Sequence, residues 1–135
     1  MMRRDFYSEL LNGIDHPETY YCRVWECQAR YEYLMLIQLK SDPAEMRGKE
    51  LFWEFQRVMY FQGPLHWQGA DFRLGSDSEC IELLAQLEPK VTHPEMLIEW
   101  DFCSLFKFKD KITGLDIKIL AGGAFGPKAK VESAP

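Results

Sequence analysis

Apolar residues alternate with polar residues between Ile98 and Phe108, and this two-residue period constrains the fold more than any other feature. The apolar positions on one side are Ile98, Trp100, Phe102, Phe106 and Phe108. Successive side chains of a strand point to opposite faces, so the pattern predicts a strand with one buried face. Cys103 and Leu105 alone break the polar side. Residues 109–114 (KDKITG) are predicted to turn the chain into a partner strand with Leu115, Ile117 and Ile119 on its inner face.

Four further segments have strand-like composition. Residues 20–27 and 31–39 are rich in aromatic and aliphatic side chains, and residues 70–74 are a short candidate. No Gly or Pro separates the first two, so either an unusual turn lies near Gln28–Arg30 or one long strand bends at a bulge. Residues 49–61 fit a strand or a helix, and their aromatic density favours a strand.

Two helices are predicted. Residues 4–12 carry apolar pairs four positions apart and precede Gly13, where a helix commonly ends. Residues 77–88 have stronger signals, because Ser76 and Glu79 have capping-box spacing and Pro89 marks the end. Cys80, Leu84 and Leu87 form the expected buried stripe of this helix.

The order of elements, α-β-β-β-(β)-α-β-β, has too few helices to connect parallel strands. It predicts an α+β fold in which a mainly antiparallel, curved sheet carries two helices packed on one face. The alternative is the same sheet curled into a half-barrel with the helices closing its mouth. Residues 1–126 are expected to form one domain, and residues 127–135 a mobile tail with little apolar content.

Charge bears on the kind of partner. The net charge is −5, and 18 acidic and 10 basic residues fall within 1–101, whereas 102–135 carry six lysines and three acids. Attraction to nucleic acid requires the opposite overall sign. The acidic body suits a cationic protein partner, or solubility alone.

The chain is expected to be cytoplasmic. Its N-terminal residues lack the apolar run of a signal peptide, and no segment approaches 18 uninterrupted apolar residues, so no membrane association is expected. The four cysteines are scattered, which favours buried, reduced thiols over a disulfide framework or a metal site.

His-Pro-Glu occurs twice, at residues 16–18 and 93–95, each time before a strand-like run. A proline there disfavours helix in the preceding residue, so structural punctuation explains the motif. The functional alternative brings His16 and His93 together with Glu18 and Glu95 as a metal or acid–base site, for which no third ligand is evident. The glycine-rich residues 122–126 match no phosphate-binding spacing and are expected to be a flexible exit from the last strand.

Two pairs of residues are candidate binding sites. His66 and Trp67 lie between Gly63-Pro64 and Gly69, where a loop can present them to a ligand or partner, or where Trp67 anchors the loop to the core. Glu99 and Asp101 share the polar side of their strand, where they can serve as an acidic contact or as a solvated sheet face.

No catalytic residue, metal or cofactor is predicted. The leading hypothesis is a small acidic protein-binding or regulatory protein, for example one that neutralises a toxin. The alternative is a small-ligand carrier or acid–base enzyme with a pocket inside the curved sheet, lined by residues such as Trp53, Phe55 and Trp100. Self-association through an exposed strand edge is a third hypothesis.

Overall fold

The computed structural model describes residues 7, 10–28, 33–40, 51–87 and 103–129. Within these ranges, seven strands form one sheet, accompanied by the helix α2 (Asp77–Leu87) and two short 3-10 helices, η1 (Leu10–Gly13) and η2 (Pro17–Thr19). The strands are β1 (Tyr21–Gln28), β2 (Leu34–Lys40), β3 (Leu51–Gln62), β4 (His66–Gln68), β5 (Arg73–Leu74), β6 (Ser104–Lys109) and β7 (Asp116–Ala129).

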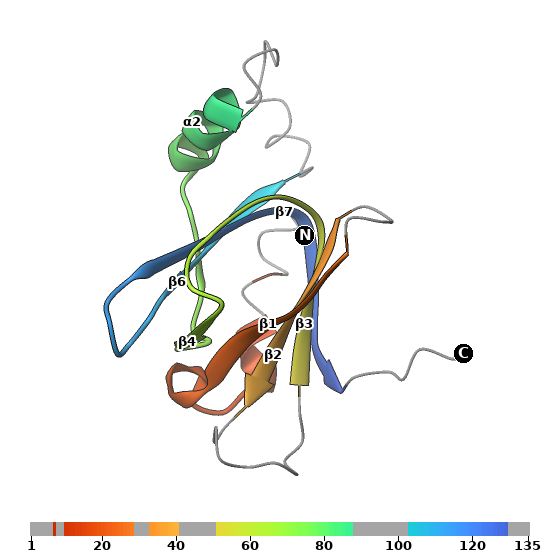
Figure 1. Ribbon diagram of the computed structural model, residues 1–135, viewed down its shortest axis with the longest axis vertical. Coiled ribbons are helices and arrows are strands. Elements are labelled where there is room, and N and C mark those ends of the chain that lie inside the picture. The colour runs from red at the N-terminus through yellow and green to blue at the C-terminus, as the bar shows by residue number, and fades with distance from the viewer. Residues whose placement is uncertain (1–6, 8–9, 29–32, 41–50, 88–102, 130–135) are drawn as a thin grey trace, which may run out of the picture.

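The sheet has the order β4-β1-β2-β3-β7-β6-β5, and every neighbouring pair is antiparallel. Figure 1 shows β3 and β7 arching together, with α2 outside the curve. The prediction of a curved, mainly antiparallel sheet is therefore confirmed, in its half-barrel form. The fold is mainly β, however, and the two-helix α+β description is only partly matched.

The ambiguous segment 49–61 is a strand from Leu51 onward. Trp53 and Phe55 lie on its inner face and are fully buried. Arg57, which interrupts the alternation in the sequence, has a φ of 51°, and the register against β7 shifts twice, between Phe52 and Glu54 and between Val58 and Tyr60. Such irregularities increase local bend and twist, which lets one strand follow the whole arch.

Aromatic rings fill the inner face of the curve. The rings of Phe55 and Phe106 lie 5.1 Å apart and those of Trp53 and Phe72 5.2 Å apart, both edge-to-face. Phe106 and Phe108 are buried there, as the alternation predicted. Burial of each such ring contributes about 1.5–3 kcal/mol, and an edge-to-face pair adds about 0.5–1.5 kcal/mol.

Helix α2 covers part of the outer face. The predicted capping box is present: the backbone N–H of Glu79 donates to Ser76 Oγ at 3.2 Å, and that of Ser76 donates to Glu79 Oε1 at 3.2 Å. Cys80 and Leu84 of the helix pack against Leu105 and Leu120 of the sheet. Lys107 Nζ lies 2.6 Å from Glu79 Oε2, which joins the first turn of α2 to β6.

The prediction that both helices pack on one face is wrong. Tyr7 and Leu10 belong to the inner core, where the ring of Tyr7 lies 5.0 Å from that of Phe106, whereas α2 packs on Leu105. Leu105 and Phe106 are neighbours on one strand and point to opposite faces. Leu105 makes part of the outer face of β6 apolar as well, so that part needs a cover of its own. Of the predicted helix 4–12, residues 4–6 and 8–9 lie outside the described residues, and η1 covers its end.

The end of the domain is also placed differently. The glycine-rich residues 122–126 are not an exit from the sheet but the middle of β7, where Gly123 pairs with Gln56 and Phe125 with Glu54. The strand continues through 127–129, which were expected to begin the tail; residues 130–135 lie outside the described residues. Leu115, expected on the inner face, precedes β7 in the turn and is 55% exposed.

Candidate functional site on the outer face of the sheet

Three polar side chains form a cross-strand row on the outer face at the β4 edge of the sheet. Arg23 of β1 is paired with His66 of β4 on one side and with Gln38 of β2 on the other. The inner-face neighbours of this row, Cys22 and Leu39, belong to the core, so the row itself points outward. His66, predicted to lie on a loop, instead begins β4 and is exposed, and its role in binding stays a prediction.

Gln38 holds the guanidinium of Arg23. Arg23 Nε and Nη2 both donate to Gln38 Oε1, at 3.1 and 2.7 Å. Arginine can only donate, so these bonds fix which end of the amide is the oxygen. Gln38 is 1% exposed, and its Nε2 has no hydrogen-bond partner in the part of the chain that the structure describes. A buried amide with an unsatisfied donor costs free energy, so this glutamine is a poor choice for stability alone.

Aromatic rings support the arginine from the side. The guanidinium carbon of Arg23 lies 5.0 Å from the centre of the Trp25 ring, a cation–π distance. The ring of Trp25 in turn meets that of Phe52 edge-to-face at 5.9 Å. Phe52 is 2% exposed and Trp25 is 40% exposed, so a buried ring anchors one that faces solvent.

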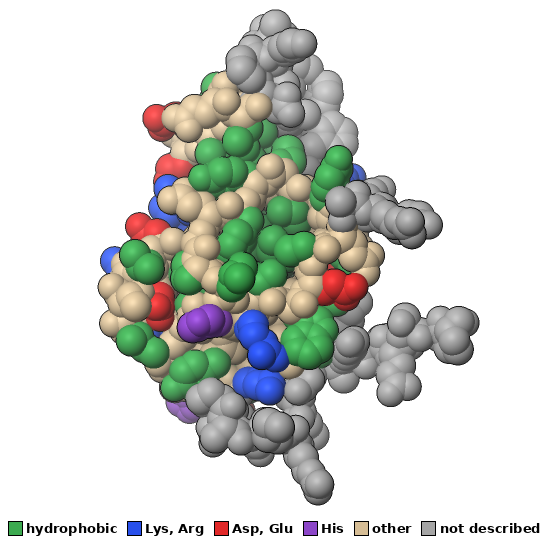
Figure 2. Space-filling view, viewed as in Figure 1, with side chains coloured by type: hydrophobic (Ala, Val, Ile, Leu, Met, Phe, Trp, Pro, Cys, Tyr) green, Lys and Arg blue, Asp and Glu red, His purple; other side chains and the backbone are tan. Residues whose placement is uncertain are grey.

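A hollow of about 270 Å³ adjoins the row. Arg23, Gln38 and His66 line it, together with Tyr21, Cys22, Lys40 and Trp67. Figure 2 shows a histidine over β4 beside Lys and Arg side chains over β1 and β2, and hydrophobic side chains gathered across the middle of the face. We call Arg23, Trp25, Gln38 and His66 the arginine cluster. Its formal charge is positive, against −5 for the chain.

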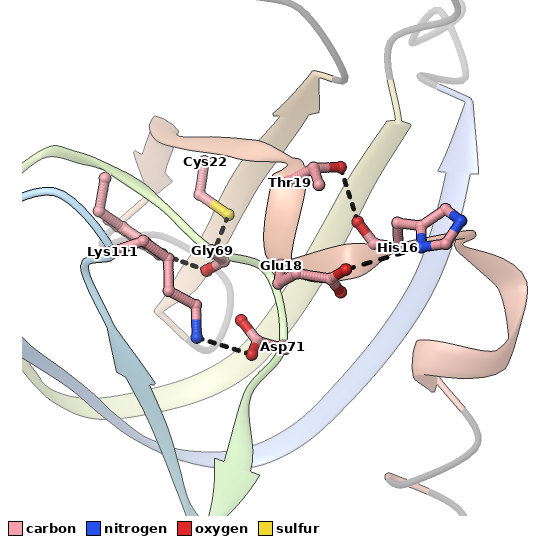
Figure 3. A network of polar contacts seen from close by, with 8 residues as sticks. His16, Glu18, Thr19, Cys22, Gly69, Asp71 and Lys111 are labelled. Carbon is pink, nitrogen blue, oxygen red and sulfur yellow. Dashed lines mark hydrogen bonds and ion pairs between the residues drawn. The ribbon is translucent and has the colours of Figure 1, made fainter.

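Trp67 faces the other way. It is 2% exposed, contacts the ring of Phe108 at 5.3 Å and donates its indole N–H to the carbonyl of Gly69 at 3.0 Å. Its ring therefore anchors the loop to the core, the alternative that the sequence left open. Figure 3 shows the same loop held by Lys111, which forms an ion pair with Asp71 at 2.9 Å, and by the Cys22 thiol near the Gly69 carbonyl.

The other predicted residues are not brought to this site. Glu99 and Asp101 lie outside the described residues, as do His93 and Glu95 of the second His-Pro-Glu. In the first, His16 Nδ1 lies 3.6 Å from Glu18 Oε1, Pro17 begins η2, and the side chains of His16 and Glu18 are exposed. This arrangement agrees with the interpretation of the first motif as punctuation.

The described residues contain no group of three His, Cys, Asp or Glu side chains placed to hold a metal ion. Burial raises the pKa of the Cys22 thiol, and nearby Asp71 raises it further, so this cysteine stays protonated. Cys80 of α2 and Cys103 are buried where the helix packs on the sheet. Cys27 is exposed, although the sequence favoured burial for all four cysteines.

Arg23, Trp25 and Gln38 were missed as site residues, although the sequence contained signals for them. Arg23 and Trp25 stand on one side of a predicted strand whose other side is apolar, and Gln38 is the only strongly polar residue between Leu34 and Leu39. Their meeting depends on the β1–β2 register. No sequence pattern specified that register, because no recognised turn motif joins the two strands.

Comparisons with protein-family models, with curated proteins and with solved structures give no match to this chain. None of the helices in the described part of the chain has the length and apolar character needed to cross a membrane.

Proposed function

We propose that this chain is a protein-binding, regulatory protein and that its partner docks on the outer face of β1, β2 and β4. The observation that carries the proposal is the exposed ring of Trp25 beside Arg23, whose positive charge meets no carboxylate among the described residues. Trp, Tyr and Arg dominate the binding energy of protein interfaces, especially where buried neighbours hold them rigid. Phe52 and Gln38 supply that rigidity here.

The strand edge beside the arginine cluster supports the same role. Strand β4 pairs only with Tyr21–Arg23, so the edge of β1 at residues 26–28 has no strand partner in the described part of the chain. Open edges can accept an extended segment of another protein, with backbone hydrogen bonds supplying affinity. A second copy of the chain could use the same edge, which would make self-association the outcome.

A toxin-neutralising role is the finer form of this proposal, because such proteins act by stoichiometric binding. Glu99 and Asp101 stay candidates for a second, acidic contact with a cationic partner. A cytoplasmic location accompanies the proposal, since all four cysteines are free thiols.

The ligand-carrier alternative gains no support from the described residues. Trp53 and Phe55, expected to line its pocket, have no exposed surface and pack edge-to-face against other rings. Trp100 lies outside the described residues.

Affinity capture from the native lysate tests the proposed function with three proteins: the wild type, Trp25→Ala, and Ile112→Ala as the matched control. Ile112 is 70% exposed in the turn before β7 and belongs to none of the three docking strands. We expect one stoichiometric protein to be captured by the wild type and by Ile112→Ala, and to be reduced by about tenfold or more with Trp25→Ala. Equal capture by all three proteins, or none by the wild type, would contradict the proposal.

A further inference from the structure

We infer that the arginine cluster is a carboxylate-binding site, which receives an acidic side chain or C-terminal carboxylate of a protein partner through Arg23. The inference rests on the proposed function and names the chemistry that the outer face recognises. Its structural basis is a guanidinium that is held in place without being neutralised.

The guanidinium has binding capacity left. Arginine has five N–H donors, and Gln38 Oε1 accepts only two donor bonds, from Nε and Nη2. No other hydrogen bond or ion pair of Arg23 exists within the described residues, and its side chain is exposed. The remaining N–H groups include those at the end of the guanidinium, on Nη1 and Nη2. This pair can form two parallel hydrogen bonds with the two oxygens of a carboxylate.

The neutral amide matters as much as the geometry. A carboxylate at position 38 would hold Arg23 equally well and would neutralise its charge. Gln38 instead orients the guanidinium without neutralising it, so the positive charge can bind an external anion. The amide of Gln38 is 1% exposed, so its position is fixed by burial. The ring of Trp25 restricts the movement of the guanidinium from one side. An arginine prepared in this way loses little conformational entropy when it binds.

The charge fits a monoanion. Arg23 contributes the one positive charge of the cluster, and the ring of His66, its cross-strand neighbour, can donate a hydrogen bond. Lys40, which lines the same hollow, already has an interaction of its own. A phosphate dianion or a nucleic-acid backbone calls for several cations, and the net charge of −5 opposes polyanions. A carboxylate needs no more than the cluster offers.

The surroundings of the hollow favour a carboxylate that belongs to a larger molecule. The hollow itself has a volume of about 270 Å³, near the lower end of the usual range of about 300–1,000 Å³ for pockets that enclose a small ligand. A protein segment can place one carboxylate on Arg23 and cover Trp25 and the edge of β1 with its neighbouring residues.

The test is an NMR titration of the full chain with N-acetyl-glutamate amide, and with N-acetyl-glutamine amide as the uncharged match. The readouts are the Nε–H signal of Arg23 and the side-chain amide signals of Gln38. We expect saturable shifts with the glutamate probe, at a dissociation constant on the order of 10 mM, and none with the glutamine probe. Shifts of equal size with both probes, or tighter binding of inorganic phosphate at the same signals, would overturn the assignment.

Three variants separate the role of each residue. Gln38→Glu keeps the shape and the two bonds to Arg23 but neutralises its charge, so we expect affinity to fall by about tenfold while the fold is kept. Arg23→Gln, an exposed position that does not threaten folding, should lose the same binding. Lys109→Gln removes an equal charge from the exposed side of β6 and should bind as the wild type does. Undiminished binding by Gln38→Glu or Arg23→Gln would contradict the inference.

Capture with Gln38→Glu distinguishes this inference from the proposed function. Loss of the captured partner with both Trp25→Ala and Gln38→Glu supports both. Loss of the captured partner with Trp25→Ala alone supports the proposed docking face but overturns the inference of a carboxylate-binding site. Saturable glutamate binding without any captured protein overturns the proposed function and, with it, the protein source of the carboxylate.

Discussion

Trp67 donates its indole N–H to the carbonyl of Gly69 at 3.0 Å, whereas the equally buried indole of Trp53 has no acceptor among the described residues. Replacement by Phe removes a similar volume at either position, but it breaks a hydrogen bond only at Trp67. A net hydrogen bond contributes about 0.5–1.5 kcal/mol, and a buried donor without a partner costs about 1–3 kcal/mol. We therefore expect Trp67→Phe to lower the free energy of unfolding by about 1–2 kcal/mol more than Trp53→Phe.

Urea denaturation followed by circular dichroism measures the difference between these two variants. Unchanged m-values in both would show that the comparison concerns stability rather than a change in the unfolded state. Equal losses would contradict the assignment of an unpaired indole at Trp53.

Glu79 makes the attachment of α2 sensitive to acid. The hydrogen bond from Lys107 and the backbone bond from Ser76 lower its pKa from 4.5 to about 2. A carboxylate with a depressed pKa stabilises the fold above its unfolded pKa and loses this contribution as the pH falls through the folded value. The wild type should therefore have a higher free energy of unfolding than Glu79→Gln. This difference should be at its full size above pH 4.5 and should vanish as the pH falls towards about 2.

Glu79→Gln is a clean probe because glutamine can keep the capping box with Ser76 while it loses the charge. Urea unfolding at a series of pH values gives the curve, with Glu82→Gln on the exposed side of the same helix as the control. A wild-type advantage over Glu79→Gln that stays constant across that range would show that the charge of Glu79 does not hold α2 to β6.

The elements that were predicted correctly are those specified by local chemistry. Alternation places Phe106 and Phe108 on the inner face of β6 whatever the rest of the chain does. The capping box of α2 needs only Ser76 and Glu79. By contrast, the pairing of β3 with β7 and the choice of face for α2 depend on contacts between distant segments, which no local pattern contains.

The site was predicted only in part, because a bulge in β1 and the β1–β2 register determine which side chains meet there. The shift between Val24 and Glu26 places Cys27 opposite Met35, on the inner side, where a regular strand would have put Cys22 and Cys27 on opposite faces. His66 could be recognised from its turn-rich context, whereas Arg23 and Gln38 become partners only through the β1–β2 register. The acidic residues Glu99 and Asp101 stay a prediction.

Two adjacent glycines of β7 should respond oppositely to alanine. A Cβ at Gly122 would overlap Nε of Arg57 and lie 3.0 Å from its Cβ, whereas a Cβ at Gly123 would make ordinary contacts with the ring of Phe125 at 3.5 Å and with Tyr7 Oη at 4.0 Å. We expect Gly122→Ala to cost about 1–3 kcal/mol through this overlap and Gly123→Ala to be neutral or stabilising by up to about 1 kcal/mol. Thermal unfolding of the two variants tests this, and equal tolerance would agree instead with a flexible exit at these residues.

Cys27 should be the one cysteine that a thiol reagent modifies in the folded protein. Cys22, Cys80 and Cys103 are 1–3% exposed, whereas Cys27 is exposed at the end of β1. Partial burial raises its pKa, and Glu26 raises it further, so labelling should be slower than that of a free thiol because the thiolate is the reactive form. Mass spectrometry over time should show one addition, absent in Cys27→Ser and about twofold to threefold faster in Glu26→Gln, where the opposing charge is gone. The other three thiols should react only in denaturant. Rapid modification of a second cysteine without denaturant would mean that the packing of the inner core or of α2 on β6 is not as described.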